Sequence, residues 1–125
     1  MIFKIKTSKD TMDIFEIIES KENLPPYILS KLSIAMSLKN PQRLKDIDFS
    51  TDTGGLELNR QTITGEFDLL YKCLIEVYEG KHIDEKEYLP KYLKSHIDRG
   101  ANLLYSEFRY SRDFISQLLK NEVGL

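Results

Sequence analysis

The chain has 125 residues, of which 41% are hydrophobic and 30% are charged, and its formal net charge is −2. This size and composition predict one globular domain and exclude a disordered chain. No apolar run approaches the roughly 20 residues that span a bilayer, and the N-terminus lacks the long apolar stretch of a secretory signal. Cys73 is the single cysteine, which excludes a disulfide framework. We therefore expect a cytoplasmic protein with no membrane partner.

Charge is distributed unevenly along the chain. Residues 1–45 carry eight Lys and Arg against five Asp and Glu, residues 46–88 carry four against eleven, and residues 89–125 carry six against four. Two basic segments therefore flank an acidic middle. A local positive surface of this kind permits nucleic-acid binding even though the whole chain is slightly acidic. The acidic middle segment is the part that we expect to face protein partners.

Residues 1–45 predict a short strand followed by two helices. In the segment MIFKIKTSK, apolar residues and lysines alternate over positions 3–6, which is the pattern of a half-exposed strand. Thr7 or Ser8 then provides the N-cap of a helix. The pair Pro25-Pro26 starts the next helix, since proline is tolerated only in the first turn. The predicted apolar stripes of the two helices are Met12, Ile14, Phe15, Ile17 and Ile18, and Ile28, Leu29, Leu32, Ala35 and Met36.

A single exposed strand needs a partner strand to cover its edge. Strand–helix–helix is the plan of the ribbon-helix-helix DNA-binding proteins, which pair this strand across a dimer and lay it in the major groove. The pattern therefore predicts a ribbon-helix-helix-like N-terminal part and an oligomer. The ordinary alternative is that lysines on the wet face of a strand serve solubility and discourage aggregation at the strand edge.

The rest of the chain predicts a loop and then helices. Residues 46–61 are rich in Asp, Ser, Thr and Gly and predict a loop, within which Leu56-Glu57-Leu58 is the one candidate for a minor extended piece. Residues 62–125 predict a helical portion. Its first helix is capped by Thr62 or Thr64.

Glycine and proline mark the remaining helices. Gly80 closes the first of them, and Pro90 interrupts the next one early, so a short turn before a longer helix is expected. Gly100 falls on the apolar stripe of that longer helix, where a missing side chain lets another helix approach closely. A last amphipathic helix is expected over residues 111–120. The predicted fold is thus mainly α, with a short N-terminal strand plus about five helices in a single domain spanning residues 1–125.

Three blocks and one junction resemble a known family. They are IKTSKDT at residues 5–11, the junction Leu24-Pro25, GLELNRQTITGEFDLLYKCLIEVYEGKHI at residues 55–83, and HIDRGANLLYSEF at residues 96–108. Together they resemble the DNA sulfur-modification protein DndE family over essentially the whole chain. The resemblance implies a small, mostly helical component of the bacterial machinery that replaces a non-bridging phosphate oxygen of DNA with sulfur. It also implies a homo-oligomer, commonly a tetramer, that prefers nicked double-stranded DNA and works with other subunits, to which the desulfurase and nucleotide-activating chemistry is assigned.

The residues themselves give little support for sulfur or nucleotide chemistry. Cys73 lies among leucine and tyrosine residues, which predicts a buried thiol acting as a small hydrophobe. Gly54-Gly55 lacks the following Gly-Lys-Ser/Thr of a P-loop. We therefore expect no cofactor.

Metal-assisted strand nicking would need two or three carboxylates or imidazoles around one divalent ion. His96 and Asp98 are two apart, which places them roughly 200° apart around a helix. His96 lies on the apolar stripe, where a hydrogen-bonded core histidine is the commoner outcome. Glu107 is nine residues beyond Asp98, too far to chelate with it, and Glu66 and Asp68 would have to come from a neighbouring helix. We assign no catalytic and no metal-binding residue.

DNA binding needs only positive groups on one surface. Lysine contacts phosphate as a point charge, whereas reading of base edges more often uses the fork of arginine. A lysine-only N-terminal region therefore favours binding of the DNA backbone with little sequence discrimination. The predicted DNA contacts are Lys4, Lys6, Lys9, Lys21, Lys31 and Lys39. A second basic set ranks below them and consists of Lys91, Lys94, Arg99, Arg109 and Arg112.

Three functional hypotheses follow. The leading one is a non-catalytic DNA-binding and scaffold subunit of the sulfur-modification system. The second is a metal-dependent nicking endonuclease of the same system. The third is a ribbon-helix-helix transcriptional regulator.

Overall fold

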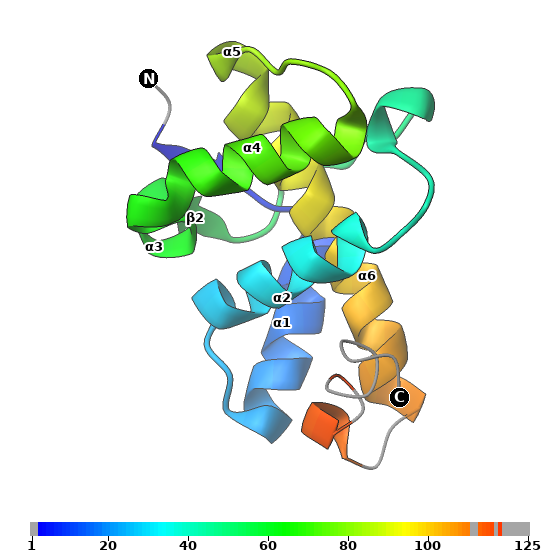
Figure 1. The fold of residues 1–125 in the computed structure, drawn as a ribbon. Helices are drawn as coiled ribbons and strands as arrows, with labels where there is room; N and C mark the ends of the chain where they lie inside the picture. Colours follow the sequence, from blue (N-terminus) through cyan, green and yellow to red (C-terminus); the bar gives the residue numbers. More distant parts are fainter. Residues whose placement is uncertain (1–2, 111–112, 117, 119–125) are drawn as a thin grey trace.

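The structure, a computed structural model, describes residues 3–110, 113–116 and 118. In chain order its elements are strand β1 (Lys4–Lys6), helices α1 (Lys9–Glu22) and α2 (Pro26–Leu38), a 3-10 turn (Leu44–Asp46), strand β2 (Glu57–Asn59), helix α3 (Arg60–Ile63), a 3-10 turn (Gly65–Phe67), helices α4 (Asp68–Glu79) and α5 (Glu85–Glu87), a π-helical segment (Tyr88–Leu93) and helix α6 (Lys94–Tyr110). The predicted mainly α class is confirmed (Figure 1).

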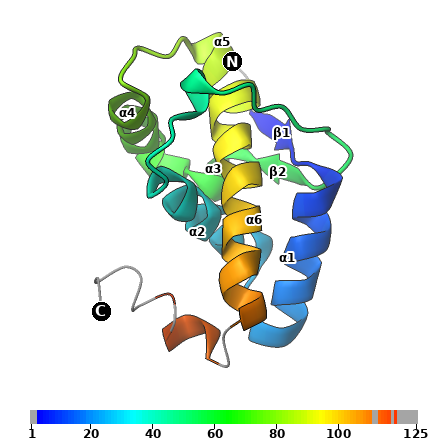
Figure 2. The same cartoon turned by 90° about the vertical axis from the view of Figure 1, so that its right-hand side faces the viewer.

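Helix α6 runs through the middle of the molecule, with α1 on one side and α2 on the other (Figure 2). Its inward residues Ile97, Ala101 and Leu104 are fully buried. They join one continuous hydrophobic core with residues from the strands and the other helices. The larger side chains of this core include Phe15, Ile18, Leu29, Ile34, Ile75, Tyr88 and Phe114.

Helices α2 and α6 approach each other at Gly100. A Cβ atom added to Gly100 would lie 1.7 Å from the backbone oxygen of Ser33, far inside any real contact distance. The prediction that Gly100 permits a close helix approach is therefore confirmed. Only a residue without a side chain lets the two backbones pack at this spacing.

The buried face of α2 differs from the predicted stripe. Ser30, Ser33 and Ser37 are fully buried, whereas Ala35 and Met36 from the predicted stripe are half-buried. Ser30 Oγ donates to the carbonyl of Pro26 (2.8 Å), and Ser33 Oγ donates to the carbonyl of Leu29 (2.7 Å). Because these hydroxyls are satisfied within their own helix, they can face α6 without a desolvation penalty.

The partner of β1 comes from the same chain. β1 pairs antiparallel with β2, with Ile5 opposite Leu58 and Lys6 opposite Glu57. The prediction that residues 46–61 are loop is therefore wrong for Glu57–Asn59, and the minor extended piece is confirmed. The sequence pattern showed that the strand needed a partner but suggested one from a second chain. Here a strand more than 50 residues away supplies it.

Several predicted helix ends are confirmed. Ser8 caps α1 by accepting from the amide of Thr11 (3.1 Å), and Gly80 closes α4 in a left-handed conformation (φ 72°). Pro90 lies in the π-helical segment between the single turn of α5 and the long α6, as the proline position predicted.

Two other predictions have a different outcome. The predicted threonine cap is wrong, and the last predicted helix is described only in part. Neither Thr62 nor Thr64 caps a helix by its side chain, because Asn59 caps α3 and α4 begins at Asp68. Part of the predicted helix at residues 111–120 lies outside the described residues, and residues 114–116 within it are helical. In the described part of the chain, no helix is long and apolar enough to cross a membrane.

The α2–α6 contact gives a direct stability test. In an exposed helix, Gly→Ala stabilises by about 1 kcal/mol. At Gly100 we expect the reverse, a loss of at least about 2 kcal/mol in the free energy of unfolding, because the added methyl group overlaps Ser33. Urea unfolding of Gly100→Ala measures this, with the exposed α6 residue changed in Ser106→Ala as the control. A Gly100→Ala protein as stable as the wild type would contradict the described packing.

Candidate nucleic-acid interface

The outer face of the two-stranded sheet carries two lysines. Ile5 points into the core, so its neighbours Lys4 and Lys6 face solvent. Glu57 and Asn59 of β2 share this outer face. Lys4 Nζ lies 3.9 Å from a Glu57 carboxylate oxygen, but both side chains are more than half exposed. Solvent-exposed pairs of this kind are worth little, so the ammonium groups are available to another anion.

Two further predicted lysines lie at opposite ends of α1. Lys9 begins the helix and makes an exposed ion pair with Asp13 (3.0 Å). Lys21 lies in the last turn, twelve residues on, which corresponds to about 18 Å along the helix axis. Lys9 therefore continues the lysine row of β1, whereas Lys21 does not.

The last two predicted lysines belong to the α2 region. The ammonium of Lys31 lies 5.8 Å from the ring centroid of Tyr27, and Lys31 also lines a groove between α2 and α4. Lys39 is the C-cap residue of α2. α6 lies between α1 and α2 (Figure 2), so Lys31 and Lys39 belong to a helix on the other side of α6 from the helix that carries Lys9 and Lys21. Lys4 and Lys6 are the members that share one face, and Lys9 follows them at the start of α1.

Two of the four described members of the second basic set act inside the fold. Lys94 and Arg99 are buried, and Lys94 pairs with Asp98 (2.6 Å). Arg109 is exposed and lies over the ring of Tyr110, and Arg112 lies outside the described residues. Lys91 is exposed as well.

His96, first considered as a metal ligand, is a buried structural residue. Its Nε2 lies 2.9 Å from a Glu79 carboxylate oxygen and its Nδ1 lies 2.8 Å from Ser37 Oγ. Arg99 Nε donates to the same hydroxyl oxygen (2.8 Å), so the hydroxyl proton of Ser37 is free to point at Nδ1. The remaining imidazole proton is then on Nε2 and is donated to Glu79. Burial lowers the pKa of His96 although Glu79 opposes this, and the nearby Arg99 adds to the lowering.

Asp98 connects α6 to the N-terminus of α1 and to the loop before β2. Its carboxylate is 1% exposed and accepts from the amide of Ser8 (3.1 Å) and from the hydroxyls of Thr11 (2.6 Å) and Thr51 (2.5 Å). Lys94 Nζ donates to it as well (2.6 Å). These contacts use the acceptor positions that a metal ion would need.

Asp68 is committed in the same way. Its carboxylate pairs with Arg60 (2.5 Å) and accepts from Thr64 (2.6 Å). Burial alone would raise the pKa of Asp68, but these hydrogen bonds outweigh it and lower the pKa. Arg60 also pairs with Glu85 (2.6 Å). Among the residues that the structure describes, no three His, Cys, Asp or Glu side chains are arranged to hold a metal ion.

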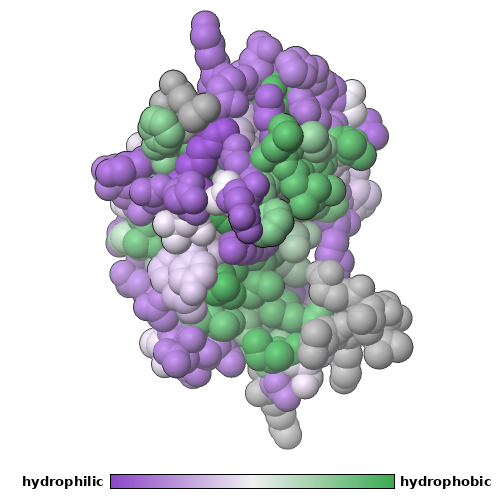
Figure 3. Space-filling model, turned by 60° about the vertical axis from the view of Figure 1, so that its left-hand side comes forward, coloured by the Kyte–Doolittle hydropathy of each residue, from purple (hydrophilic) through white to green (hydrophobic). Residues whose placement is uncertain are grey.

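Helix α4 turns most of its apolar stripe to solvent. Its fully buried residues are Ile75 and Glu79. The exposed apolar side chains at this helix are Phe67 (57%), Leu69 (73%), Leu70 (55%), Leu74 (47%) and Val77 (78%). Figure 3 shows hydrophobic side chains gathered on this side of the molecule. We call this surface, together with the adjoining groove of about 450 Å³ between α2 and α4, the α4 apolar face.

The prediction that Cys73 is a buried core thiol is wrong. Cys73 lies on α4 and is exposed. Helical periodicity correctly grouped the apolar residues of this segment onto shared faces of one helix. It could not show whether a face is covered by the same chain.

The sequence also left two basic residues unassigned. Lys45 and Lys81 line one pocket together with Lys91, although they come from three separate segments of the chain. No sequence spacing connects them, so only the folded arrangement brings them together.

The family model for the DNA sulphur modification protein DndE matches residues 4–112. The chain belongs to the DndE family. Its fold is similar to the crystal structure of DndE from Escherichia coli B7A involved in DNA phosphorothioation modification, with a TM-score of 0.67 and 21% identity over 83% of this chain and 97% of that one. It is also similar to a double glycine-to-lysine DndE mutant involved in DNA phosphorothioation, with a TM-score of 0.65 and 19% identity over 82% and 97% of the two chains. No curated protein matched the chain.

The family match and the two crystal structures agree on one fold. The family model covers β1, the central helix α6 and the α4 apolar face together, since its matched residues are 4–112. The resemblance to the DndE family noted in the sequence is thereby confirmed.

The buried His96 predicts how the stability of this DndE-family protein depends on pH. Because its pKa in the fold lies below the unfolded value of about 6.5, the unfolded chain binds more protons below that pH. The free energy of unfolding is therefore fully retained above about pH 6.5 and falls at lower pH, by up to about 1.4 kcal/mol per pH unit.

Urea unfolding between pH 7.5 and 5.5 measures this dependence. His96→Gln keeps a donor toward Glu79 and an acceptor toward Ser37 but does not titrate, so we expect a flatter pH dependence in this variant. The same slope in both proteins would show that His96 is not the titrating group.

Proposed function

We propose that this chain is a non-catalytic, oligomeric DNA-binding subunit of a DNA phosphorothioation system. It binds double-stranded DNA, with a preference for nicked duplex, and works with the other subunits of that system. Membership of a family of DNA sulphur modification proteins supports the system. The preference for nicked duplex rests on the resemblance to this family.

The observation that carries the DNA-binding proposal is the lysine row of β1 and the start of α1. Lys4 and Lys6 lie on one exposed face, and Lys9 follows in the first turn of the next helix. A two-stranded ribbon fits the width of the major groove, and lysine ammonium groups then contact phosphates. Within the described part of the ribbon's outer face there is no arginine, which favours recognition of backbone rather than of base sequence.

The two rival hypotheses have weaker support. Nicking by a metal ion would draw on His96, Asp98 or Asp68, but each of these has its polar atoms engaged in internal hydrogen bonds. A ribbon-helix-helix regulator pairs its strand with that of a second chain, whereas β1 pairs with β2 of the same chain.

We further propose that the α4 apolar face joins two copies of this chain, as one of the interfaces of an oligomer of up to four copies. A two-fold interface uses the same patch on both partners, so the patch must fit itself. The α4 apolar face has both parts that this needs. Leu69 and Val77 project as a ridge, and the groove between α2 and α4 provides the opposing hollow. An exposed apolar surface of this kind is a usual mark of a protein interface.

The DNA-binding proposal is tested by reversing charge on β1. Lys4→Glu combined with Lys6→Glu should abolish binding to nicked duplex in a fluorescence anisotropy titration, because each lysine neutralises a phosphate. For the wild type, the logarithm of affinity should fall with the logarithm of salt concentration with a slope of several units.

The matched control is Lys72→Glu combined with Lys86→Glu. It changes the net charge of the protein by the same amount as the β1 variant, but at α4 and α5. Lys4→Gln with Lys6→Gln avoids placing a new carboxylate beside Glu57, and its binding should be weakened as well. Equal losses in the control and the β1 variants would mean that only net charge matters, and a flat salt response would contradict phosphate contact.

The oligomer proposal is tested by light scattering. The wild type should have a mass several times that of the 14.6 kDa chain, with four copies as the expected upper state. Leu70→Asp with Val77→Asp places charge in the α4 apolar face and should yield a folded protein with at most half the mass of the wild type. Ile17→Asp changes an exposed residue of α1 and should leave the mass unchanged. A monomeric wild type at micromolar concentration would refute the proposed interface.

A further inference from the structure

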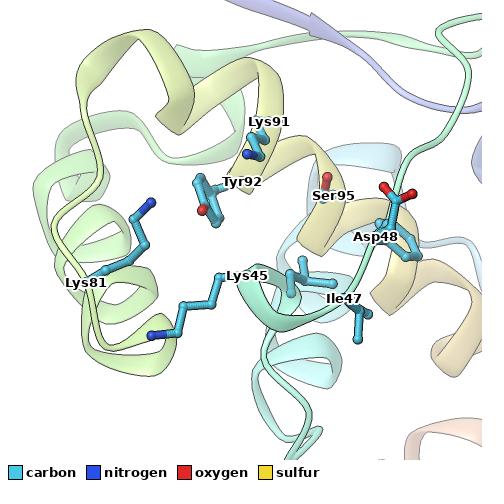
Figure 4. Close-up of a pocket in the computed structure, with 9 residues that line it drawn as sticks. Lys45, Ile47, Asp48, Lys81, Lys91, Tyr92 and Ser95 are labelled. Atoms are coloured by element: carbon cyan, nitrogen blue, oxygen red, sulfur yellow. The ribbon is translucent and has the colours of Figure 1, made fainter.

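A pocket of about 370 Å³ lies apart from the lysine row of β1. Its charged walls come from three segments: Lys45 from the 3-10 turn after α2, Lys81 from the segment after α4, and Lys91 from the π-helical segment. Figure 4 shows these three side chains around the ring of Tyr92. The ammonium groups of Lys81 and Lys91 lie 5.5 and 5.4 Å from the centre of that ring.

The C-terminus of α4 explains how the cations gather. A Cβ atom added to Gly80, the C-cap of α4, would lie 3.7 Å from Lys45 Nζ. Cations are drawn to helix C-termini by the unpaired carbonyl groups, which together resemble about half a negative charge. Contact with Tyr92 raises the pKa of Lys81, and the nearby Glu87 and Asp84 carboxylates add to this.

No carboxylate is in direct contact with the three ammonium groups in the described part of the chain, since none of Lys45, Lys81 and Lys91 forms a salt bridge there. Asp48 is the acidic residue that lines the pocket, and Figure 4 places it at the opposite end from Lys81 and Lys45. Among the residues that line the pocket, three lysines stand against one carboxylate, so the lining carries more positive than negative charge.

The rest of the lining suits a ligand larger than a bare anion. Tyr92 and Ser95 bring hydroxyl groups, while Ile47 and the half-buried Phe49 bring apolar surface. The volume falls in the range of sites for small organic ligands, about 300–1,000 Å³. An aromatic side chain beside a cationic cluster is the combination that binds a base together with its phosphate.

We infer that this pocket binds the phosphate monoester of a nucleotide, with the phosphate among Lys45, Lys81 and Lys91 and the nucleoside toward Phe49. A phosphate monoester carries about −1.5 to −2 charges at neutral pH, so it is attracted more strongly than a singly charged anion to a lining with three lysines and one carboxylate. A phosphodiester within a continuous strand carries one charge and cannot enter a pocket end-on. The ligand is therefore a free mononucleotide or the terminal nucleotide of a DNA strand.

Calorimetric titration of the full-length protein tests the inference. Deoxyadenosine 5′-monophosphate should bind at least ten-fold more tightly than deoxyadenosine, and also more tightly than inorganic phosphate. Equal binding of the nucleotide and the nucleoside would overturn the phosphate assignment. Equal binding of the nucleotide and inorganic phosphate would overturn the nucleotide assignment.

Charge-neutral variants locate the site. Lys81→Gln combined with Lys91→Gln should weaken binding of deoxyadenosine 5′-monophosphate at least ten-fold, with an unchanged thermal unfolding curve because both side chains are exposed. Lys86→Gln, on the neighbouring α5, should change the affinity less than two-fold. A control variant that loses as much affinity as the pocket variant would overturn the site.

Two blunt duplexes of one sequence, with 5′-phosphate or 5′-hydroxyl ends, identify the source of the ligand. Tighter binding of the phosphorylated duplex by the wild type, lost in the pocket variant, assigns the site to DNA strand ends. Equal binding of the two duplexes, with nucleotide binding retained, assigns it to a free nucleotide. The DNA arm rests on the proposed function. The variant Lys4→Glu with Lys6→Glu should still bind deoxyadenosine 5′-monophosphate. This result would show that loss of DNA binding at β1 and loss of nucleotide binding in the pocket can be distinguished.

Discussion

The close contact between α2 and α6 at Gly100 is the constraint on which the rest of the structure depends. With the Ser33 carbonyl occupying the space of a side chain, α6 is held in the middle of the molecule, and successive residues of this helix then reach different neighbours. His96 reaches α4 through Glu79, and Asp98 reaches the start of α1 and the loop before β2. A helix held less closely could not make these buried hydrogen bonds at once, and an unpaired buried charge costs several kcal/mol.

This arrangement decides which polar groups can serve function. The ionisable residues of α6 that resemble catalytic or DNA-contacting groups are used inside the fold, where their hydrogen-bonding capacity is filled. Exposed lysines gather on short or irregular segments, at β1 and around Tyr92. The apolar surface left for a partner lies on α4, away from β1 in the chain and next to α2. The surface thus separates cationic regions suited to phosphates from an apolar region suited to protein.

The sequence predicted best what depends on neighbouring residues. The cap at Ser8, the interruption at Pro90, the glycine end of α4 and the buried character of His96 all follow from local patterns. What it could not supply depends on distant contacts or on other molecules. β1 pairs with a strand more than 50 residues away in the chain. The three pocket lysines follow no regular sequence spacing that would connect them. Cys73 belongs to a helix whose apolar stripe is left uncovered by its own chain, a property that periodicity alone does not reveal.

The central claim is that duplex DNA contacts the β1 lysine row and leaves the α4 apolar face to protein. Amide hydrogen exchange of the protein, free and saturated with nicked duplex, tests this most directly, because it reports both surfaces in one measurement. The account predicts slower exchange over residues 4–12 on DNA binding and unchanged exchange over residues 68–79. Slower exchange confined to residues 68–79, with residues 4–12 unchanged, would contradict it.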